Sequence, residues 1–512
     1  DFHNYMNVPE GGQFSTSFNA YIDGKTNGLA SNGLQQGHAP TAFATGVIRN
    51  GKVSLLDGDK DIRDNLQDYN ISLLEGVNIG GSRTANFNDV LTDFVEVSKA
   101  IFSNRALNKH TTMTWGYGSE LNTFKRAIDN VIDEYQSMFE EEQKTGTLTP
   151  EGLSFLNSLE KLNNIEEVVD AKGDTYTSAE KKREALIANI HELYCEGLEA
   201  TLSPDVIRAR SLVRASSLVH TLVDEMMVFK THSGFELTVG GRESKGLEKG
   251  VTESGTYGFD NINGKKNTIT QYNYETIQTP QAASSSKSAG EVTWGGALPA
   301  PIQSIDGSVV AMTVAGPSWE RLTKVKNKPY VHTIYDAFKM DVDSYDVVLA
   351  ESNKNWMKIN EDWNYMQQTL DSLNNSWEKF TNKVKSNPNE PIPPHTQRFM
   401  DHLFSPIHEN TKMTTLQHKL LGLNEQLNFL GDDPLNESKQ LVNRLGYMPK
   451  RNMKEYKEFV NRLIGSMRMK GQIKTHIDHM NNEKKKILKM IKEEGLGFDF
   501  NGEWIPLQYY AH

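Results

Sequence analysis

Three short stretches follow one another in this 512-residue chain. They are Asp23-Gly24-Lys25-Thr26-Asn27-Gly28 (segment A), Arg105, Lys109, Tyr117 and Gly118 at spacings of four, eight and one (segment B), and Tyr335-Asp336-Ala337-Phe338 (segment C). Each is weak evidence alone, because Asp-Gly is common in turns and an Arg/Lys pair four residues apart is ordinary on a helix. Their joint occurrence in this order is hard to reach by chance.

The aspartates of segments A and C each follow a short run that is typical of a strand. Asp23 follows Phe18–Ile22, and Asp336 follows the run Tyr330–Tyr335. Carboxylates suit Mg²⁺, and two such ions about 3.5–4 Å apart can clamp the attacking and leaving oxygens of a nucleotidyl transfer. We expect Asp23 and Asp336, with the Gly24 carbonyl as a further ligand, to hold two Mg²⁺ ions. The alternative is that each aspartate starts a turn.

Segment B is predicted to lie on a helix. Arg105, Lys109 and Tyr117 would then fall within a sector of roughly 120° and could face one substrate. We expect Arg105 and Lys109 to bind a triphosphate and Lys109 to protonate the leaving pyrophosphate. Tyr117 and Gly118 would lie beside the sugar and the base at the helix end. The alternative is an exposed basic face with a packed aromatic residue.

With the phrase Gln303-Ser304-Ile305-Asp306-Gly307-Ser308, these segments resemble the motifs of the single-subunit RNA polymerases of phages and mitochondria. The resemblance covers roughly residues 15–345. It implies a helix-rich α+β fold, with a right-hand polymerase palm and fingers and a helical C-terminal extension. It also implies that the chain synthesises RNA from ribonucleoside triphosphates on a DNA template. Segments A and C most resemble the corresponding motifs of the virion-packaged RNA polymerases of Schitoviridae-type podophages. This resemblance implies that the protein is located in the phage virion and then in the host cytoplasm.

Segment A separates two polymerase classes that share segment B. The DNA polymerase I group continues its motif A with a glutamate that excludes the 2′-hydroxyl, whereas the Asp-Gly-x3-Gly form seen here is that of the RNA polymerases. The resemblance places Gln303, Asp306 and Tyr335 at the primer and template, with residues 303–308 on a strand. Gln303 and Tyr335 each stand where the family has histidine. Two other readings stay open: a DNA polymerase I-like enzyme, and a non-catalytic virion or ejection protein that retains the fold.

The pattern along the chain predicts five parts. They are a first palm part with segment A (1–85), helical fingers with segment B (86–230), a β-rich insertion (231–295), a second palm part with segment C (296–346) and a helical C-terminal extension (347–512). Within the second palm part, strands are predicted at Val309–Val314 and Tyr330–Tyr335. The insertion lies where the family has its promoter-specificity loop; the alternative is a disordered insertion. Because a promoter-binding domain and a thumb precede motif A in this family, we expect an N-terminal polymerase fragment or a second subunit as partner.

Charge is distributed unevenly along the chain. The net charge is −11, yet Arg444–Lys492 holds fourteen Lys/Arg and four Asp/Glu, a net +10. An inward apolar face is predicted there from the helical spacing of Tyr456, Phe459, Val460, Leu463, Ile464 and Met467. We expect this basic segment to contact nucleic acid or, alternatively, an acidic face of the chain itself.

Two classes of structure are excluded by composition. The only cysteine is Cys195, which excludes an intrachain disulfide and a Cys-rich zinc site. No run approaches the 18 or more apolar residues of a membrane span, so we expect no membrane segment.

Overall fold

The computed structural model describes most of the chain between residues 19 and 493. The described ranges are 19–24, 27–38, 62–75, 90–119, 123–169, 175–201, 204–239, 247–260, 266–278, 296–325, 329–334, 337–393, 452–493 and 510–511, with isolated positions at 41, 45, 396–397, 400–401, 422–424 and 427–428. For Asp23, Gly24 and the strands within 247–278 it describes the backbone alone.

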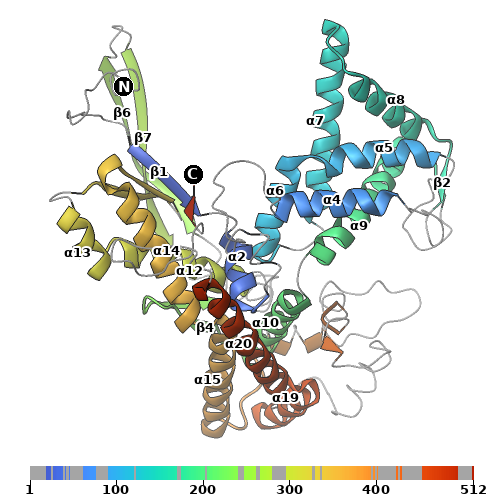
Figure 1. The fold of residues 1–512 in the computed structure, drawn as a ribbon. Coiled ribbons are helices and arrows are strands. Elements are labelled where there is room, and N and C mark those ends of the chain that lie inside the picture. Colours follow the sequence, from blue (N-terminus) through green and yellow to red (C-terminus); the bar gives the residue numbers. More distant parts are fainter. Residues whose placement is uncertain are drawn as a thin grey trace.

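The described residues form a helix-rich α+β protein with small antiparallel sheets, which confirms the coarse fold class (Figure 1). The helices gather around two apolar cores. We call the parts built on these cores the helical lobe and the body.

The helical lobe carries segment B. It contains α4 (Ile62–Leu74), α5 (Leu91–Phe102), α6 (Arg105–Gly116), α7 (Phe124–Thr145), α8 (Pro150–Asn164), the hairpin of β2 (Val168–Val169) and β3 (Thr175–Tyr176), and α9 (Ala179–Thr201). Its core includes Phe94, Trp115 and Tyr194, each almost fully buried. Burial of aromatic side chains of this size is a large share of what holds a small helical unit together.

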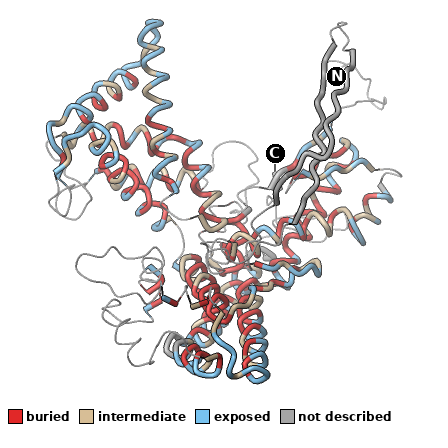
Figure 2. The backbone as a smooth tube through the Cα atoms, turned by 180° about the vertical axis from the view of Figure 1, so that it is seen from behind, coloured by how far each residue is buried: buried red, intermediate tan, exposed pale blue. Residues whose placement is uncertain are grey.

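The body carries segments A and C. It contains β1 (Asn19–Gly24), α2 (Asn27–Gln35), α10 (Pro204–Val223), β4 (Met227–Lys230), β5 (Glu236–Val239), α12 (Pro299–Thr313), α13 (Gly316–Val325), β8 (Val331–Ile334), β9 (Ala337–Asp341), a 3₁₀ turn (Val342–Ser344), α14 (Tyr345–Asp362), α15 (Tyr365–Ser386), α19 (Met453–Met467) and α20 (Met469–Glu493). Figure 2 shows buried residues concentrated where these helices pack together. The C-terminal helices therefore belong to the same core as segment A.

The central sheet has the strand order β10-β1-β9-β8, where β10 is Tyr510–Ala511. Its strands alternate between two faces, as strands do. Ile22, Phe338 and Met340 are fully buried in the body core, to which α12 and α14 also contribute. Tyr21 of β1, between two inward residues, is 48% exposed on the other face. One face of the sheet is thus covered by helices, and Tyr21 lies on the other face.

A long hairpin projects from the body. β6 (Leu247–Asp260) and β7 (Lys266–Gln278) pair along their whole length, with an irregularity between Val251 and Glu253. The predicted β-rich character of this part is confirmed, while the loop predicted at Ala282–Gly290 lies outside the described residues. Figure 1 shows this hairpin and the helical lobe extending from different sides of the body.

One predicted element is wrong. Residues 303–308 and 309–313 lie on helix α12, whereas we expected strands. α12 packs against α2, α13, α14 and β5. A helix that is buried on several sides lacks the polar stripe of a surface helix. Its apolar, β-branched run therefore has the sequence pattern of a buried strand.

Other predictions hold with small exceptions. The strands expected next to Asp23 and at Tyr330–Tyr335 are confirmed at Asn19–Gly24 and Val331–Ile334. The helix expected after Asp346 is confirmed to Ser386 and again at Met453–Glu493, with a break at Asn387, while most of residues 394–451 lies outside the described part of the chain. The range predicted as helical fingers also contains the β2–β3 hairpin and β4, and its helix α10 packs in the body core. No helix in the described ranges is long and apolar enough to cross a membrane.

Candidate functional site

Segments A and C lie on adjacent strands. Ile22 of β1 pairs with Phe338 of β9, and Ile334 of β8 pairs with Ala337 of β9. Asp23 directly follows Ile22, and Asp336 precedes Phe338 by two positions in the chain. One cross-strand pair therefore lies within two positions of both candidate aspartates.

The side chains of the two aspartates themselves are not described. Tyr335 and Asp336 lie outside the described residues, and for Asp23 and Gly24 only the backbone is given. That backbone has a second neighbour, since Asp23 pairs with Ala511 and Gly24 with Tyr510. Among the side chains that are described, no group of three His, Cys, Asp or Glu could hold a metal ion. The metal ligands Asp23, Gly24 and Asp336 stay a prediction.

Segment B forms helix α6, as predicted. Asn104 caps its start by accepting a hydrogen bond from the Leu107 backbone N–H at 2.8 Å. Arg105 and Lys109 are both exposed on the helix. The Arg105 guanidinium forms an ion pair with Asp64 of α4 at 2.6 Å, with 58% of the arginine side chain exposed. An exposed pair of this kind contributes about 0–1 kcal/mol, so an incoming polyanion could replace Asp64.

The end of α6 is built from Tyr117 and Gly118. Tyr117 is the C-cap residue, and Gly118 follows with a φ of 101°, a conformation that favours glycine. A Cβ on Gly118 would come within 2.7 Å of the Leu298 Cβ, so a larger residue has no room there. The half-buried Tyr117 donates a hydrogen bond from its hydroxyl to Asp306 Oδ2 at 3.2 Å.

Helix α2, which begins in segment A, touches the end of α6 at two glycines. A Cβ on Gly28 would lie 3.2 Å from Cε1 of Tyr117, and a Cβ on Gly116 would lie 3.1 Å from the Leu29 nitrogen. The Asn32 amide of α2 also donates to the Gly116 carbonyl at 2.9 Å. Glycine at both positions lets α2 and α6 approach closely, which sets the Tyr117 ring against the start of α2.

Two arginines that we did not single out from the sequence hold the end of α6. Arg210 of α10 donates to the carbonyls of Trp115 and Ser119, both at 2.9 Å, and its guanidinium lies 3.7 Å from the centre of the Trp115 ring. Arg214, one turn on, donates to the Gly118 carbonyl at 3.1 Å. Positive charge at a helix C-terminus complements the helix dipole. The available signal was two arginines, one turn apart, on a helix that is mostly buried.

Two of the three residues predicted to contact primer and template, Gln303 and Asp306, lie in different environments on α12. Asp306 is buried, with 8% of its surface exposed, and faces Tyr117, while Gln303 is exposed. Ser308 lies on the same helix and shares a hydrogen bond with Ser233 at 3.0 Å. The helix therefore presents Asp306 to segment B rather than to the solvent.

The structure brings together Gly28, Tyr117, Gly118 and Asp306. Arg105 and Lys109 lie farther along the same helix, because a rise of 1.5 Å per residue puts them about 18 and 12 Å from Tyr117 along the axis. These spacings suit a substrate with its base near the helix end and its phosphates toward the helix start.

The C-terminal helix α20 packs against the helix that follows segment A. His476 shares a hydrogen bond with Gln36 at 2.6 Å, and Gly37, with a φ of 65°, leaves no space for a Cβ beside Lys484 and Met480. Burial lowers the pKa of His476 to about 4 and that of Lys484 to about 8, although Glu361 and Asp362 oppose the second shift. These buried contacts hold α20 against the end of α2.

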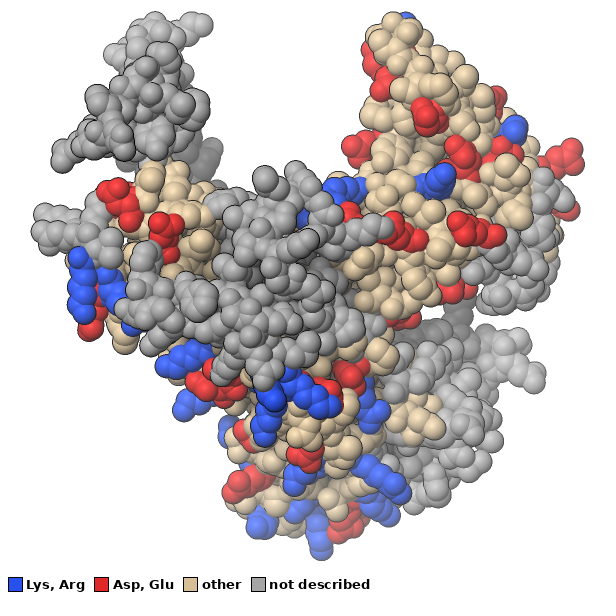
Figure 3. All heavy atoms as spheres, viewed as in Figure 1, with Lys and Arg blue, Asp and Glu red and all other residues tan. Residues whose placement is uncertain are grey.

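The inward and outward faces predicted for the basic segment are partly confirmed. Tyr456, Phe459 and Val460 are buried, and Ile464 packs partly against the core. Lys454, Arg462 and Arg468 are exposed. Figure 3 shows Lys and Arg side chains gathered over the lower part of the body, among fewer acidic ones. Binding of nucleic acid to this surface stays a prediction.

No protein-family model matches the chain, and no curated protein is similar to it.

Proposed function

We propose that this chain is the catalytic part of a template-directed nucleotidyl transferase, a DNA-dependent RNA polymerase with a right-hand palm and fingers. The central sheet of the body would be the palm, and the helical lobe the fingers. The β6–β7 hairpin would be the promoter-specificity element.

One observation carries the proposal. The pairing of Ile22 with Phe338 joins segments A and C, which lie more than three hundred positions apart in the sequence, on neighbouring antiparallel strands. Two unrelated turn-forming aspartates would not be expected beside paired positions of strands that are so far apart in the sequence. A two-metal phosphoryl transfer requires two carboxylates close together, and this pairing would bring Asp23 and Asp336 to the same end of the sheet.

Further support comes from the way segment B meets segment A. Gly28 packs against the Tyr117 ring, and the Tyr117 hydroxyl is bound to Asp306 of the phrase at 303–308. The described parts of all four sequence stretches therefore lie in or next to the body, where α6 ends at Tyr117. Independent helices and turns with no common role would not need to converge.

The proposed roles follow from charge and position. Asp23 and Asp336, with the Gly24 carbonyl, would hold Mg²⁺, because hard oxygen donors suit this ion. When bound, the metal ions would supply electrophilic stabilisation of the attacking and leaving oxygens. Arg105 and Lys109 would bind the triphosphate, and Lys109 would donate a proton to the leaving pyrophosphate. Tyr117 would contact the sugar of the incoming nucleotide.

A primer-extension assay tests this function. The chain, alone and with any copurifying polypeptide, is given a primed single-stranded DNA template, Mg²⁺ and either ribo- or deoxyribonucleoside triphosphates. We expect template-dependent extension with ribonucleotides. Extension with deoxyribonucleotides only would instead support a DNA polymerase I-like enzyme. Absence of extension under every condition would support a protein that keeps the fold without the activity.

A further inference from the structure

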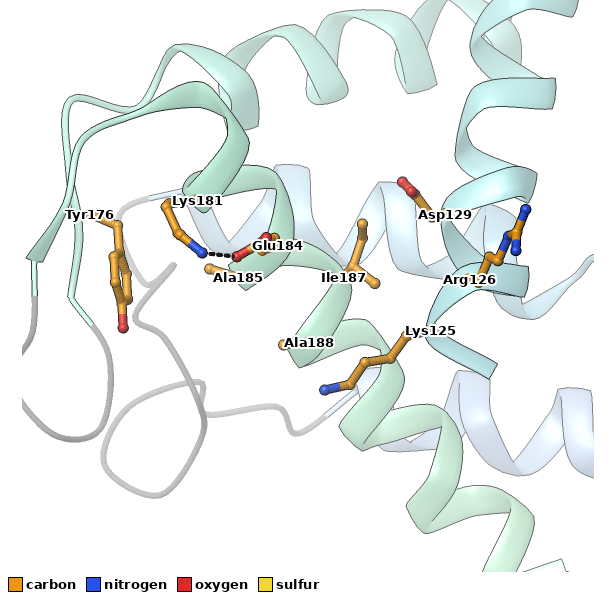
Figure 4. Close-up of a pocket in the computed structure, with 9 residues that line it drawn as sticks. All are labelled: Lys125, Arg126, Asp129, Tyr176, Lys181, Glu184, Ala185, Ile187 and Ala188. Carbon is orange, nitrogen blue, oxygen red and sulfur yellow. Dashed lines mark hydrogen bonds and ion pairs between the residues drawn. The ribbon is translucent and has the colours of Figure 1, made fainter. Parts of the chain in front are cut away.

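A cavity of about 490 Å³ lies in the helical lobe, away from segments A and C (Figure 4). It is formed by the start of α7, the first half of α9 and strand β3. Its volume falls within the roughly 300–1,000 Å³ of ligand-binding cavities. The proposed nucleotidyl transfer does not use it.

The floor of the cavity is apolar and the sides are not. Ala185, Ile187 and Ala188 of α9 line it, and the two alanines leave space on the helix surface. In Figure 4 these alanines lie between the Tyr176 ring on one side and the Lys125 side chain on the other. The cavity therefore combines a flat aromatic surface, an apolar floor and cationic groups.

The acidic residues of the cavity already have cationic partners. Glu184 pairs with Lys181 at 2.6 Å, and Asp129 pairs with Arg183 at 2.9 Å. Lys125 and Arg126, on the first turn of α7, are exposed, and neither forms an ion pair with a residue that the structure describes. Among the described residues, these two cations are thus the lining groups best placed to meet an anionic ligand.

We propose that this cavity binds one nucleotide unit, with its base against Tyr176 and its phosphate at Lys125 and Arg126. A base stacks on an aromatic ring without regard to sequence, and lysine and arginine are the usual partners of phosphate. The proposal rests on the proposed function, since a polymerase meets this chemistry both in a nucleic-acid strand and in free nucleoside triphosphates. A site in the lobe would hold such a unit apart from the reacting centre.

Photocrosslinking to the full chain, without Mg²⁺ so that no extension occurs, tests the proposal. One arm uses a single-stranded DNA oligonucleotide carrying 5-iodouracil, and the other uses 8-azido-ATP. Peptide mapping by mass spectrometry then locates the attached residue. We expect attachment within residues 175–188, at Tyr176 or its neighbours. Attachment from the oligonucleotide identifies a strand as the source, and attachment from 8-azido-ATP identifies a free nucleotide.

Matched variants separate specific binding from general charge. The double variant Lys125→Glu, Arg126→Glu should reduce attachment in this peptide at least tenfold. Tyr176→Ala should reduce it about tenfold, whereas Tyr176→Phe keeps the aromatic ring and should keep the attachment. The control is the double variant Lys99→Glu, Lys144→Glu, which changes the net charge by the same amount. Both lysines are exposed on this lobe but do not line the cavity, so attachment should be unchanged.

Two results would overturn the proposal: no attachment at 175–188 from either probe, or equal attachment in the Lys125→Glu, Arg126→Glu variant with an unchanged melting temperature. Neither depends on catalysis. Primer extension without attachment would therefore reject the cavity alone, and attachment without extension would reject the proposed function alone.

Discussion

The hydroxyl of Tyr117 donates a hydrogen bond to Oδ2 of Asp306 at 3.2 Å, across 189 positions of sequence. This bond joins the end of α6 to the buried helix α12. It also fixes the direction of the Tyr117 hydroxyl at this helix end. The ring below it packs against Gly28 of segment A.

Removal of that hydroxyl should weaken discrimination between ribose and deoxyribose. Tyr117→Phe keeps the ring packing but loses a group able to sense the 2′-position, and one hydrogen bond contributes about 0.5–1.5 kcal/mol. We expect the ratio of kcat/KM for ribo- over deoxyribonucleotides to fall about three- to tenfold. Tyr135→Phe is a matched control, because it removes a hydroxyl bonded to Asn104 within the helical lobe. An unchanged ratio for Tyr117→Phe would show that the hydroxyl has no such role.

The close approach of α2 and α6 should not tolerate a methyl group. Gly116→Ala places a Cβ 3.0 Å from Leu29 Cγ and 3.2 Å from the Gly28 carbonyl carbon, so one helix must move. Overpacking of this kind costs about 1–3 kcal/mol. Gly307→Ala on α12 is the control, since nothing lies within 4 Å of its Cβ and alanine favours a helix. Thermal unfolding should show a lower melting temperature for the first variant and an equal or higher one for the second. Equal stability of both would mean that the helices are not held together at these glycines.

Lys109 should affect catalysis more than binding of the template. Lys109→Ala removes an exposed cation from α6, so the fold should be retained. General acid catalysis contributes typically about 10²–10⁴-fold, and we expect kcat to fall by at least about 10²-fold. Lys99→Ala, on the exposed face of α5, should leave kcat unchanged. A variant that lost affinity for template but extended normally at saturation would indicate a basic DNA-facing helix instead.

The contact between α20 and α2 should make the protein sensitive to acid. Burial lowers the pKa of His476 to about 4 from an ordinary 6.5, so the folded state binds fewer protons than the unfolded state between these values. Stability is therefore fully present above pH 6.5 and is lost as the pH falls toward 4. The loss between pH 7 and pH 5 is about 2 kcal/mol.

His476→Gln isolates that contribution, because its amide can still meet Gln36 and has no titration in this range. The drop in melting temperature between pH 7 and pH 5 should be smaller in this variant than in the wild type. His220 also has a pKa lowered to about 4 by burial, so part of the acid sensitivity should remain. An identical drop in both proteins would show that His476 does not contribute.

Local patterns predicted the strands at 18–22 and 331–334 and the helix of segment B, because alternation and helical spacing are local properties. They failed at α12, where neighbours on several sides remove the amphipathic period. The position of α10 in the body core, and the packing of α20 on α2, were also out of reach. Both depend on contacts between distant parts of the chain.

The candidate site divides in the same way. Tyr117, Gly118 and Asp306 were selected from the sequence, and the structure brings them together. Gly28 was quoted only as part of a motif, and its packing on Tyr117 became visible only in three dimensions. Arg210 and Arg214 were missed because their partners are backbone carbonyls, which no sequence pattern identifies.

The central claim is that Asp23 and Asp336 act together on metal ions. Either replacement by asparagine keeps size and shape but removes the charge that Mg²⁺ requires. The most direct measurement is ribonucleotide extension with Mg²⁺ by Asp23→Asn and Asp336→Asn, beside Asp343→Asn, an exposed aspartate just after β9. We predict a fall in kcat of about 10³-fold or more for each of the first two, with unchanged melting temperatures, and a normal rate for the third. Near-normal extension by Asp23→Asn or Asp336→Asn would contradict the claim.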